Sequence, residues 1–74
     1  MPDYTTKAHR IELGEAIRAR RDKQGITQQE LALKTDCGQS NIYRIETGRV
    51  SVGIDVLVRI ARALEITVGE LVSF

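Results

Sequence analysis

A short run of polar side chains near the middle of the chain has the residue types and spacing best suited to chemistry. Glutamine amides pair with adenine, arginine guanidinium groups pair with guanine, and serine hydroxyls pair with several base edges. A helix predicted over residues 39–47 would place these groups on one outer face, because side chains three and four positions apart lie together on a helix. The predicted base-contacting residues are Gln39, Ser40, Tyr43 and Arg44. An ordinary polar surface helix is the alternative interpretation.

Catalytic and metal-binding chemistry have little support in the sequence. The chain contains one His and one Cys, and it has neither a phosphate-binding glycine loop nor a pair of carboxylates with a supporting pocket. His9 has no second metal ligand near it, and Cys37 has no partner for an intramolecular disulfide. We interpret Cys37 as a small core residue, with a redox switch as the alternative. The sequence therefore predicts no enzyme activity, no metal site, no cofactor and no small-molecule substrate.

Length and charge limit the kind of surface that the chain presents. Its 74 residues make one small domain, and an aromatic content of 4% means that Ile, Leu, Val and Ala must build the core. The formal net charge is +1, so affinity for nucleic acid would depend on local placement of basic residues. The apolar runs are too short for a signal peptide or a membrane span, so we expect a cytoplasmic protein that does not contact a membrane.

Helices must position the polar run, because no alternating strand pattern of useful length occurs. Pro2 and the weak periodicity around it predict a flexible N-terminal arm over residues 1–8, followed by one domain over residues 9–74. The expected helices cover residues 9–24, 28–34, 39–47 and 54–64, with a last short helix after Thr67. The apolar face of the fourth helix is predicted to comprise Ile54, Leu57, Ile60, Ala61 and Leu64. Together these patterns predict an all-α fold.

Residues that begin and end helices divide the middle of the chain into two helices with a tight break between them. Thr27 and Glu30 have the spacing of a capping box, in which each side chain hydrogen bonds to the other residue's backbone N–H. Gly48 is suited to end the second helix, and Thr67 with Glu70 predicts another capping box. Two helices joined in this way are typical of a helix-turn-helix unit, whose second helix enters the major groove of DNA.

The order and spacing of several short pieces resemble the Cro/C1-type helix-turn-helix domain, also called the XRE family, over roughly residues 11–71. The matching pieces are Gly25-Ile26-Thr27-Gln28, Glu30-Leu31-Ala32, Ile42, Arg44-Ile45-Glu46, Gly48, Leu57, Ile60-Ala61, Ala63-Leu64 and Glu70-Leu71. No single piece is specific, but the ordered set is. The resemblance implies a compact five-helix fold like that of lambda repressor, with the helix over residues 39–47 in the DNA major groove.

The resemblance also assigns roles outside the polar run. It implies that Gln28 binds a DNA phosphate, which agrees with the free N–H groups and the positive dipole at a helix N-terminus. It pairs Arg21 with Glu46 in a partly buried structural ion pair, in which an unpaired charge would cost several kcal/mol. The positions that depart from the family pattern, and would loosen the turn, are Arg20, Thr35, Asp36 and Gly38.

Further polar residues flank the predicted recognition helix. Phosphate contacts position a protein on DNA without reading its sequence. Besides Gln28, the predicted phosphate-contacting residues are Lys34, Asn41, Arg49 and Ser51. Arg44 is also suited to such a contact. The alternative is that these side chains are simply solvated.

A homodimer is predicted because one recognition helix reads only a short stretch of DNA. Such domains bind paired half-sites about one turn (~34 Å) apart, so the operator would be pseudo-palindromic. The C-terminal third also contains apolar residues that a small core would leave uncovered. The predicted interface residues are Val52, Val56, Val68, Val72 and Phe74. The alternative is that they complete the core.

Two functions from different classes are compatible with these patterns. One is a sequence-specific transcriptional regulator that binds double-stranded DNA. Within that class, the segment Ser51-Val52-Gly53-Ile54-Asp55 is similar to controller proteins of restriction–modification systems, although phage repressors and antitoxins use the same domain. The other is a protein-interaction module or antitoxin subunit with the same fold, which the near-zero net charge would favour.

Overall fold

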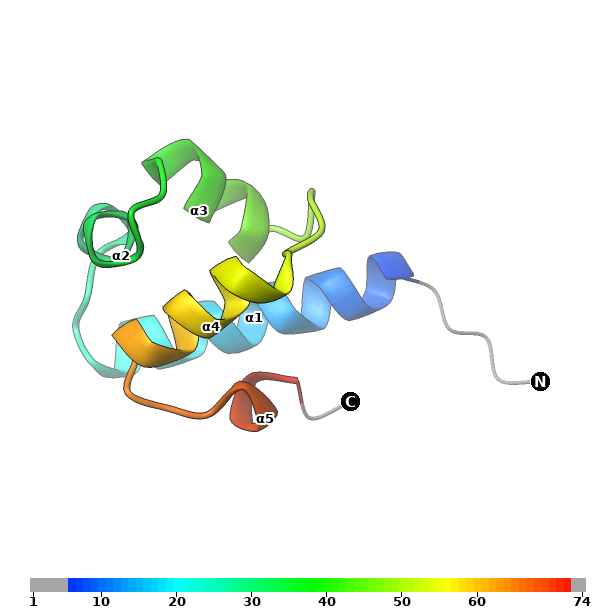
Figure 1. Ribbon diagram of the computed structural model, residues 1–74. Coiled ribbons are helices and arrows are strands. Elements are labelled where there is room, and N and C mark those ends of the chain that lie inside the picture. The colour runs from blue at the N-terminus through cyan, green and yellow to red at the C-terminus, as the bar shows by residue number, and fades with distance from the viewer. Residues whose placement is uncertain (1–5, 73–74) are drawn as a thin grey trace.

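Hydrophobic side chains from five helices meet in one core. The computed structural model describes residues 6–72, in which the helices are α1 (Thr6–Lys23), α2 (Gln28–Thr35), α3 (Gln39–Glu46), α4 (Ile54–Ala63) and α5 (Val68–Leu71) (Figure 1). The largest fully buried apolar side chains are Ile17, Leu31, Ile42, Ile60, Leu64 and Leu71. The predicted all-α, five-helix fold is confirmed.

The packing of the helices places α3 at the surface. α3 contacts α1 and α2, α2 also contacts α4, and α5 contacts both α1 and α4. In Figure 1, α3 and α5 therefore lie on opposite sides of the molecule. Within the described part of the chain, no helix is both long and apolar enough to cross a membrane.

Helix α1 begins at Thr6, three residues before the predicted start at residue 9. Residues 6–8 therefore belong to the helix rather than to the predicted arm, whose residues 1–5 lie outside the described range. The first turns of α1 are tied to the end of α3, because Arg10 Nε donates to the Gly48 carbonyl at 3.2 Å. This contact joins the N-terminal part of α1 to the turn that follows α3.

Four helices end in the same way, with one residue in the left-handed region of backbone conformation. These residues are Gly25 (φ 69°), Asp36 (φ 56°), Gly48 (φ 73°) and Glu65 (φ 58°). In each case the following N–H donates to the carbonyl five positions earlier at 2.9–3.0 Å, which satisfies a carbonyl that the helix leaves free. Gly48 has a second constraint, because a Cβ there would lie 2.7 Å from Ile11 Cγ1.

The buried polar side chains of the turn between α2 and α3 are hydrogen bonded, although the turn departs from the family pattern. Thr35 belongs to α2 rather than to the break, and its buried hydroxyl donates to the Leu31 carbonyl at 2.7 Å. Asp36 adopts a left-handed conformation that short polar residues tolerate. Gly38 gives α3 no side-chain cap. Within residues 6–72, no buried side-chain nitrogen or oxygen lacks a hydrogen-bond partner, so these departures leave no buried polar side chain unpaired.

The predicted capping box at the start of α2 is confirmed. Glu30 N–H donates to Thr27 Oγ1, and Thr27 N–H donates to Glu30 Oε1, both at 3.1 Å. The second predicted box is only half formed, because Thr67 accepts from the Glu70 N–H while the Glu70 carboxylate lies 3.5 Å from Arg20. Arg20, at a position where the family has an apolar residue, thus has a partner on α5.

Two positions show how tertiary packing changes the predicted pattern. Ile54 was expected on the inward apolar face of α4, but as the first residue of that helix it is 66% exposed. Gly14 lies where α1 meets α3, and a Cβ there would lie 2.5 Å from the carbonyl oxygens of Ile45 and Glu46. The close approach of these two helices therefore requires glycine at position 14.

Candidate nucleic-acid interface

Helix α3 separates its residues into a buried face and an exposed face. Ile42, Ile45 and Glu46 are buried. The residues predicted to contact bases are all exposed: Gln39, Ser40, Tyr43 and Arg44. α3 ends at Glu46, with Thr47 as its C-cap, one residue earlier than predicted. Apolar packing on one side of the helix thus leaves the other side free to meet a ligand.

A surface hollow runs between the start of α2 and the exposed face of α3. It has a volume of about 430 Å³ and is lined by Gln28, Gln39, Ser40 and Tyr43. A neighbouring hollow of about 550 Å³ extends it toward α1, where Arg18 and Arg21 contribute. The structure therefore brings Gln28 together with three of the four predicted base-contacting residues.

The predicted ion pair between Arg21 and Glu46 is present and joins α1 to α3. Arg21 Nε donates to Glu46 Oε2 at 2.7 Å, and Arg21 Nη2 donates to Oε1 at 3.1 Å. The two side chains are 11% and 2% exposed, respectively. Arg21 Nη1 also donates to the Ile26 carbonyl at 2.9 Å. The hydrogen bonds to Glu46 raise the pKa of Arg21, so the guanidinium remains charged.

Gln28 shares the Glu46 carboxylate with Arg21. Its Nε2 donates to Glu46 Oε1 at 3.0 Å, which holds the amide at the first turn of α2. The sequence did not predict this contact, because residues 28 and 46 lie on different helices and meet only through the packing of α2 against α3. A single buried carboxylate therefore orients groups from α1 and α2 beside α3.

Arg49 lies over the ring of Tyr43, with its Cζ 5.5 Å from the ring centre. The left-handed turn at Gly48 brings the chain back toward α3 after the helix ends. The spacing of residues 43 and 49 matches no helical repeat, so this contact also was not predicted. It places a charge predicted to contact phosphate against the exposed face of α3.

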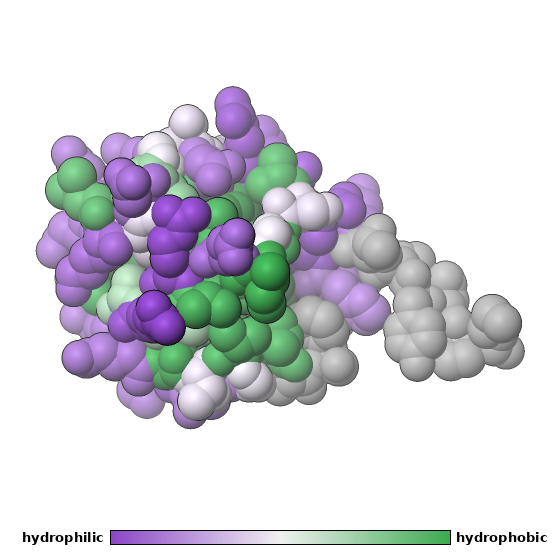
Figure 2. All heavy atoms as spheres, in the orientation of Figure 1, coloured by the Kyte–Doolittle hydropathy of each residue, from purple (hydrophilic) through white to green (hydrophobic). Residues whose placement is uncertain are grey.

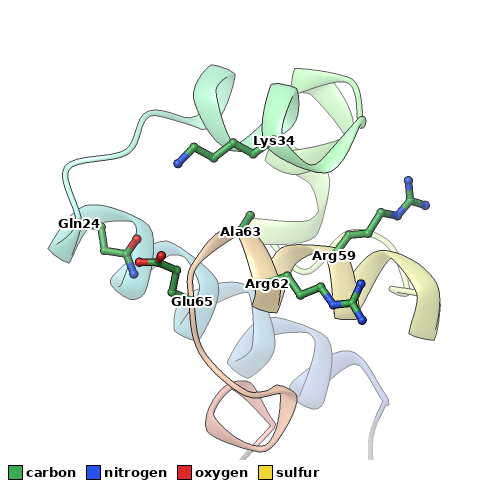
Figure 3. A pocket seen from close by; sticks show the side chains of 6 residues that line it. All are labelled: Gln24, Lys34, Arg59, Arg62, Ala63 and Glu65. Carbon is green, nitrogen blue, oxygen red and sulfur yellow. The ribbon is translucent and has the colours of Figure 1, made fainter.

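Lys34 does not lie with the other predicted phosphate-contacting residues. It is six residues after Gln28, which corresponds to about 240° around the helix and ~9 Å along it. It lines a different hollow, of about 510 Å³, between α2 and α4. Figure 3 shows its ammonium group pointing toward the end of α1, while Arg59 and Arg62 extend to the other side. Lys34 therefore lies on a different side of α2 from Gln28 and does not line the hollows beside α3.

The remaining predicted phosphate-contacting residues have different exposures. Ser51 is exposed in the connection between α3 and α4, whereas Asn41 is half-buried on α3. Neither residue lines the hollows beside α3. Both would meet only a ligand that extends beyond those hollows.

Apolar side chains gather on the surface near α4 and α5 (Figure 2). The predicted interface residues Val52, Val56, Val68 and Val72 are half-buried and pack against the core. Phe74 lies outside the described residues. Ile54 is exposed and Val58 half-buried on α4, so both add to the apolar surface that the core leaves accessible.

The chain belongs to the helix-turn-helix family HTH_3, whose model matches residues 17–71. An uncharacterized HTH-type transcriptional regulator from Sinorhizobium fredii is 37% identical over 54 residues, which are 73% of this chain and 28% of that protein. The chain thus spans less than a third of the length of that relative.

Two solved structures are similar over most of the chain. The restriction–modification controller protein C.AhdI from Aeromonas hydrophila has a TM-score of 0.84 and 28% identity, over 86% of this chain and 97% of that one. The clp gene regulator ClgR from Corynebacterium glutamicum has a TM-score of 0.86 and 28% identity, over 97% of this chain and 88% of that one.

Proposed function

We propose that the chain binds a specific DNA operator, with α3 in the major groove and Gln39, Ser40 and Arg44 reading base edges. The observation that carries this proposal is the division of α3 into a buried face and an exposed polar face. Tyr43 shares the exposed face, and its ring carries the Arg49 guanidinium. A helix with an outer face of amide, hydroxyl and guanidinium groups is complementary to base edges in the major groove.

Phosphate contacts would come from residues around α3. Gln28 at the start of α2 is the first candidate, because its amide is already held by Glu46 and the N-terminus of α2 favours an anion. Further contacts to the DNA phosphates would come from Asn41 on α3 and from Arg49 and Ser51 in the segment after it. Lys34 is not part of this proposed surface, since it lines the hollow between α2 and α4.

The proposed DNA-binding form is a homodimer joined near α4 and α5. One copy of α3 reads a short half-site, so two copies related by a two-fold axis would read a pseudo-palindrome. Ile54 and the half-buried Val56 and Val58 make the surface of α4 apolar, and Val72 and Phe74 are the C-terminal candidates. Ile54→Glu is expected to shift sedimentation equilibrium toward monomer, whereas Leu33→Glu, at an exposed position on α2, is not.

Within the regulators, the likeness to the controller C.AhdI favours a similar role, because it extends over 97% of that protein. A role as a repressor is part of the proposal, as is action in the cytoplasm, where a transcriptional regulator meets its DNA. The competing proposal is a protein-interaction module or antitoxin subunit. Its support is the formal net charge of +1, which is low for a protein that binds DNA.

Removal of single charges would distinguish the two proposals. Arg44→Ala and Arg49→Ala are compared with Arg62→Ala, which changes an exposed arginine on α4 away from α3. Anisotropy of a labelled random-sequence duplex is measured against salt. A DNA-binding protein loses affinity in the first two variants, with a salt slope smaller by about one for each lost phosphate contact. Equal affinities in all variants would favour the interaction module.

A further inference from the structure

Tyr43 and Arg49 are two exposed side chains that contact each other on the surface. Tyr43 is 44% exposed and Arg49 is also exposed. The 5.5 Å between Arg49 Cζ and the ring centre is within the range of a cation–π interaction. The ring therefore restricts where the Arg49 charge lies in the free protein.

The backbone that carries Arg49 is held independently of this contact. Arg49 N–H donates to the Arg44 carbonyl at 2.9 Å, and the Gly48 carbonyl accepts from Arg10 Nε. Gly48 itself lies against Ile11 and has a positive φ. The Cα of Arg49 is thus fixed relative to α3 and α1, and the remaining freedom is that of its side chain.

The guanidinium of Arg49 has no competing acceptor in the described part of the chain. No hydrogen bond or ion pair to its side chain occurs within residues 6–72, so its N–H groups remain available to a phosphate. Arg44 is also exposed, on α3 itself, but it has no aromatic ring beneath it among those residues. Of these two exposed arginines, only Arg49 is supported by the Tyr43 ring.

We propose that Tyr43 is a positioning residue for Arg49, and that its ring holds the guanidinium ready to bind a DNA phosphate. The inference rests on the proposed DNA-binding function, and it gives Tyr43 a role other than direct base contact. Arginine loses much side-chain freedom when it is immobilised, so a guanidinium that is already restricted binds with a smaller entropic cost. The hydroxyl of Tyr43 is not needed for this role.

The first test uses the free protein and does not depend on DNA. Proton NMR would record the ring-current shift of the Arg49 Cδ protons in the wild type, Tyr43→Phe and Tyr43→Leu. We expect an upfield shift that Tyr43→Phe keeps and Tyr43→Leu removes. The Cδ protons of Arg62, on α4 away from α3, are the control that should not move. Equal Arg49 shifts in all three proteins would show that the contact is absent and would overturn the proposal.

The second test measures binding to the duplex that the wild type enriches from a random pool. Tyr43→Phe should bind within about twofold of the wild type, and Tyr43→Leu about two- to fivefold more weakly, as expected for an exposed cation–π contact. Arg49→Ala should bind more weakly still. Adding Tyr43→Leu to Arg49→Ala should have no further effect, because the ring acts only through the arginine.

Two outcomes would overturn the positioning role while leaving DNA binding intact. Tyr43→Phe binding as weakly as Tyr43→Leu would mean that the hydroxyl contacts DNA directly. If the fold-losses of DNA affinity in Tyr43→Leu and Arg49→Ala multiply in the double variant, the ring contacts DNA independently of Arg49. If the wild type enriches no duplex and binds random-sequence DNA only weakly, the proposed function itself fails, and the NMR shift then reports a contact without this role.

Discussion

The two faces of α3 belong to the same eight residues but are held by different means. The inner face is fixed by buried Ile42 and Ile45 and by the Glu46 carboxylate, which accepts hydrogen bonds from Arg21 and Gln28. The outer face consists of exposed polar side chains that the fold does not require. Substitutions on the inner face should therefore change stability, whereas those on the outer face should change binding.

The uncapped start of α3 explains why this helix depends on the packing of its inner face for stability. α2 begins with a capping box, but α3 begins at Gly38 with no side-chain cap. A helix of this length is unstable in isolation, so its packing must supply the stability. The position of the outer face therefore depends on the contacts of the inner one.

Glu46→Ala is expected to have the largest effect. It leaves the Arg21 guanidinium partly buried without its carboxylate, and breaking such a pair costs about 3–5 kcal/mol. Urea denaturation would measure the free energy of unfolding. Glu46→Gln, which keeps the size of the side chain and an acceptor for Arg21, should lose less and remain folded. A loss below ~1 kcal/mol in Glu46→Ala, as for a surface pair, would contradict a structural role for this face.

Gly14→Ala is expected to be the next most damaging change. Its Cβ would meet the carbonyl oxygens of Ile45 and Glu46 at 2.5 Å, so α1 and α3 would have to move apart at a cost of about 1–3 kcal/mol. Gly69→Ala in α5 is the matched control, because the nearest atom to its Cβ lies at 3.8 Å. The control should be neutral or more stable by up to ~1 kcal/mol. Equal melting temperatures for the two variants would contradict the close approach.

Gln39→Ala tests the outer face. The lost amide should cost about 1–3 kcal/mol of affinity for the selected operator if it pairs with a base. The free energy of unfolding should stay within about 0.5 kcal/mol, because Gln39 is exposed. Anisotropy and urea denaturation would measure the two quantities. A variant that loses stability but keeps its affinity would reverse the assignment of the faces.

Glu30→Gln should have the smallest effect on the free energy of unfolding, and the size of that effect should depend on pH. Hydrogen bonds from Thr27, chiefly from its backbone N–H, lower the pKa of Glu30 below its ordinary value of 4.5. The carboxylate therefore stabilises the fold fully above that value, and this stability is lost as the pH falls through the pKa of the folded state. Urea denaturation at pH 7 and pH 3 should show the wild type and the variant converging at the lower pH. A constant difference would argue against the capping contribution.

Local signals in the sequence predicted much of the fold. The Thr27–Glu30 capping box and the glycine that ends α3 depend on neighbours within a few residues. The family resemblance added the Arg21–Glu46 pair, and the structure contains it.

Features created by packing between helices were not predictable in this way. The need for glycine at position 14 arises only where α1 meets α3, and the bond from Gln28 to Glu46 needs α2 placed against α3. Lys34 lines the hollow between α2 and α4, and its distance from Gln28 in sequence does not show which neighbouring helix it faces. Exposure of Ile54 follows from its place at the first turn of α4.

Selection of bound duplexes from a random DNA pool, with the affinity of the enriched duplexes followed against salt, would test the central claim most directly. The account predicts an inverted repeat with half-sites about one helical turn apart and an affinity that falls steeply with salt. No enrichment, with only weak binding at low salt, would contradict the claim that the outer face of α3 reads DNA.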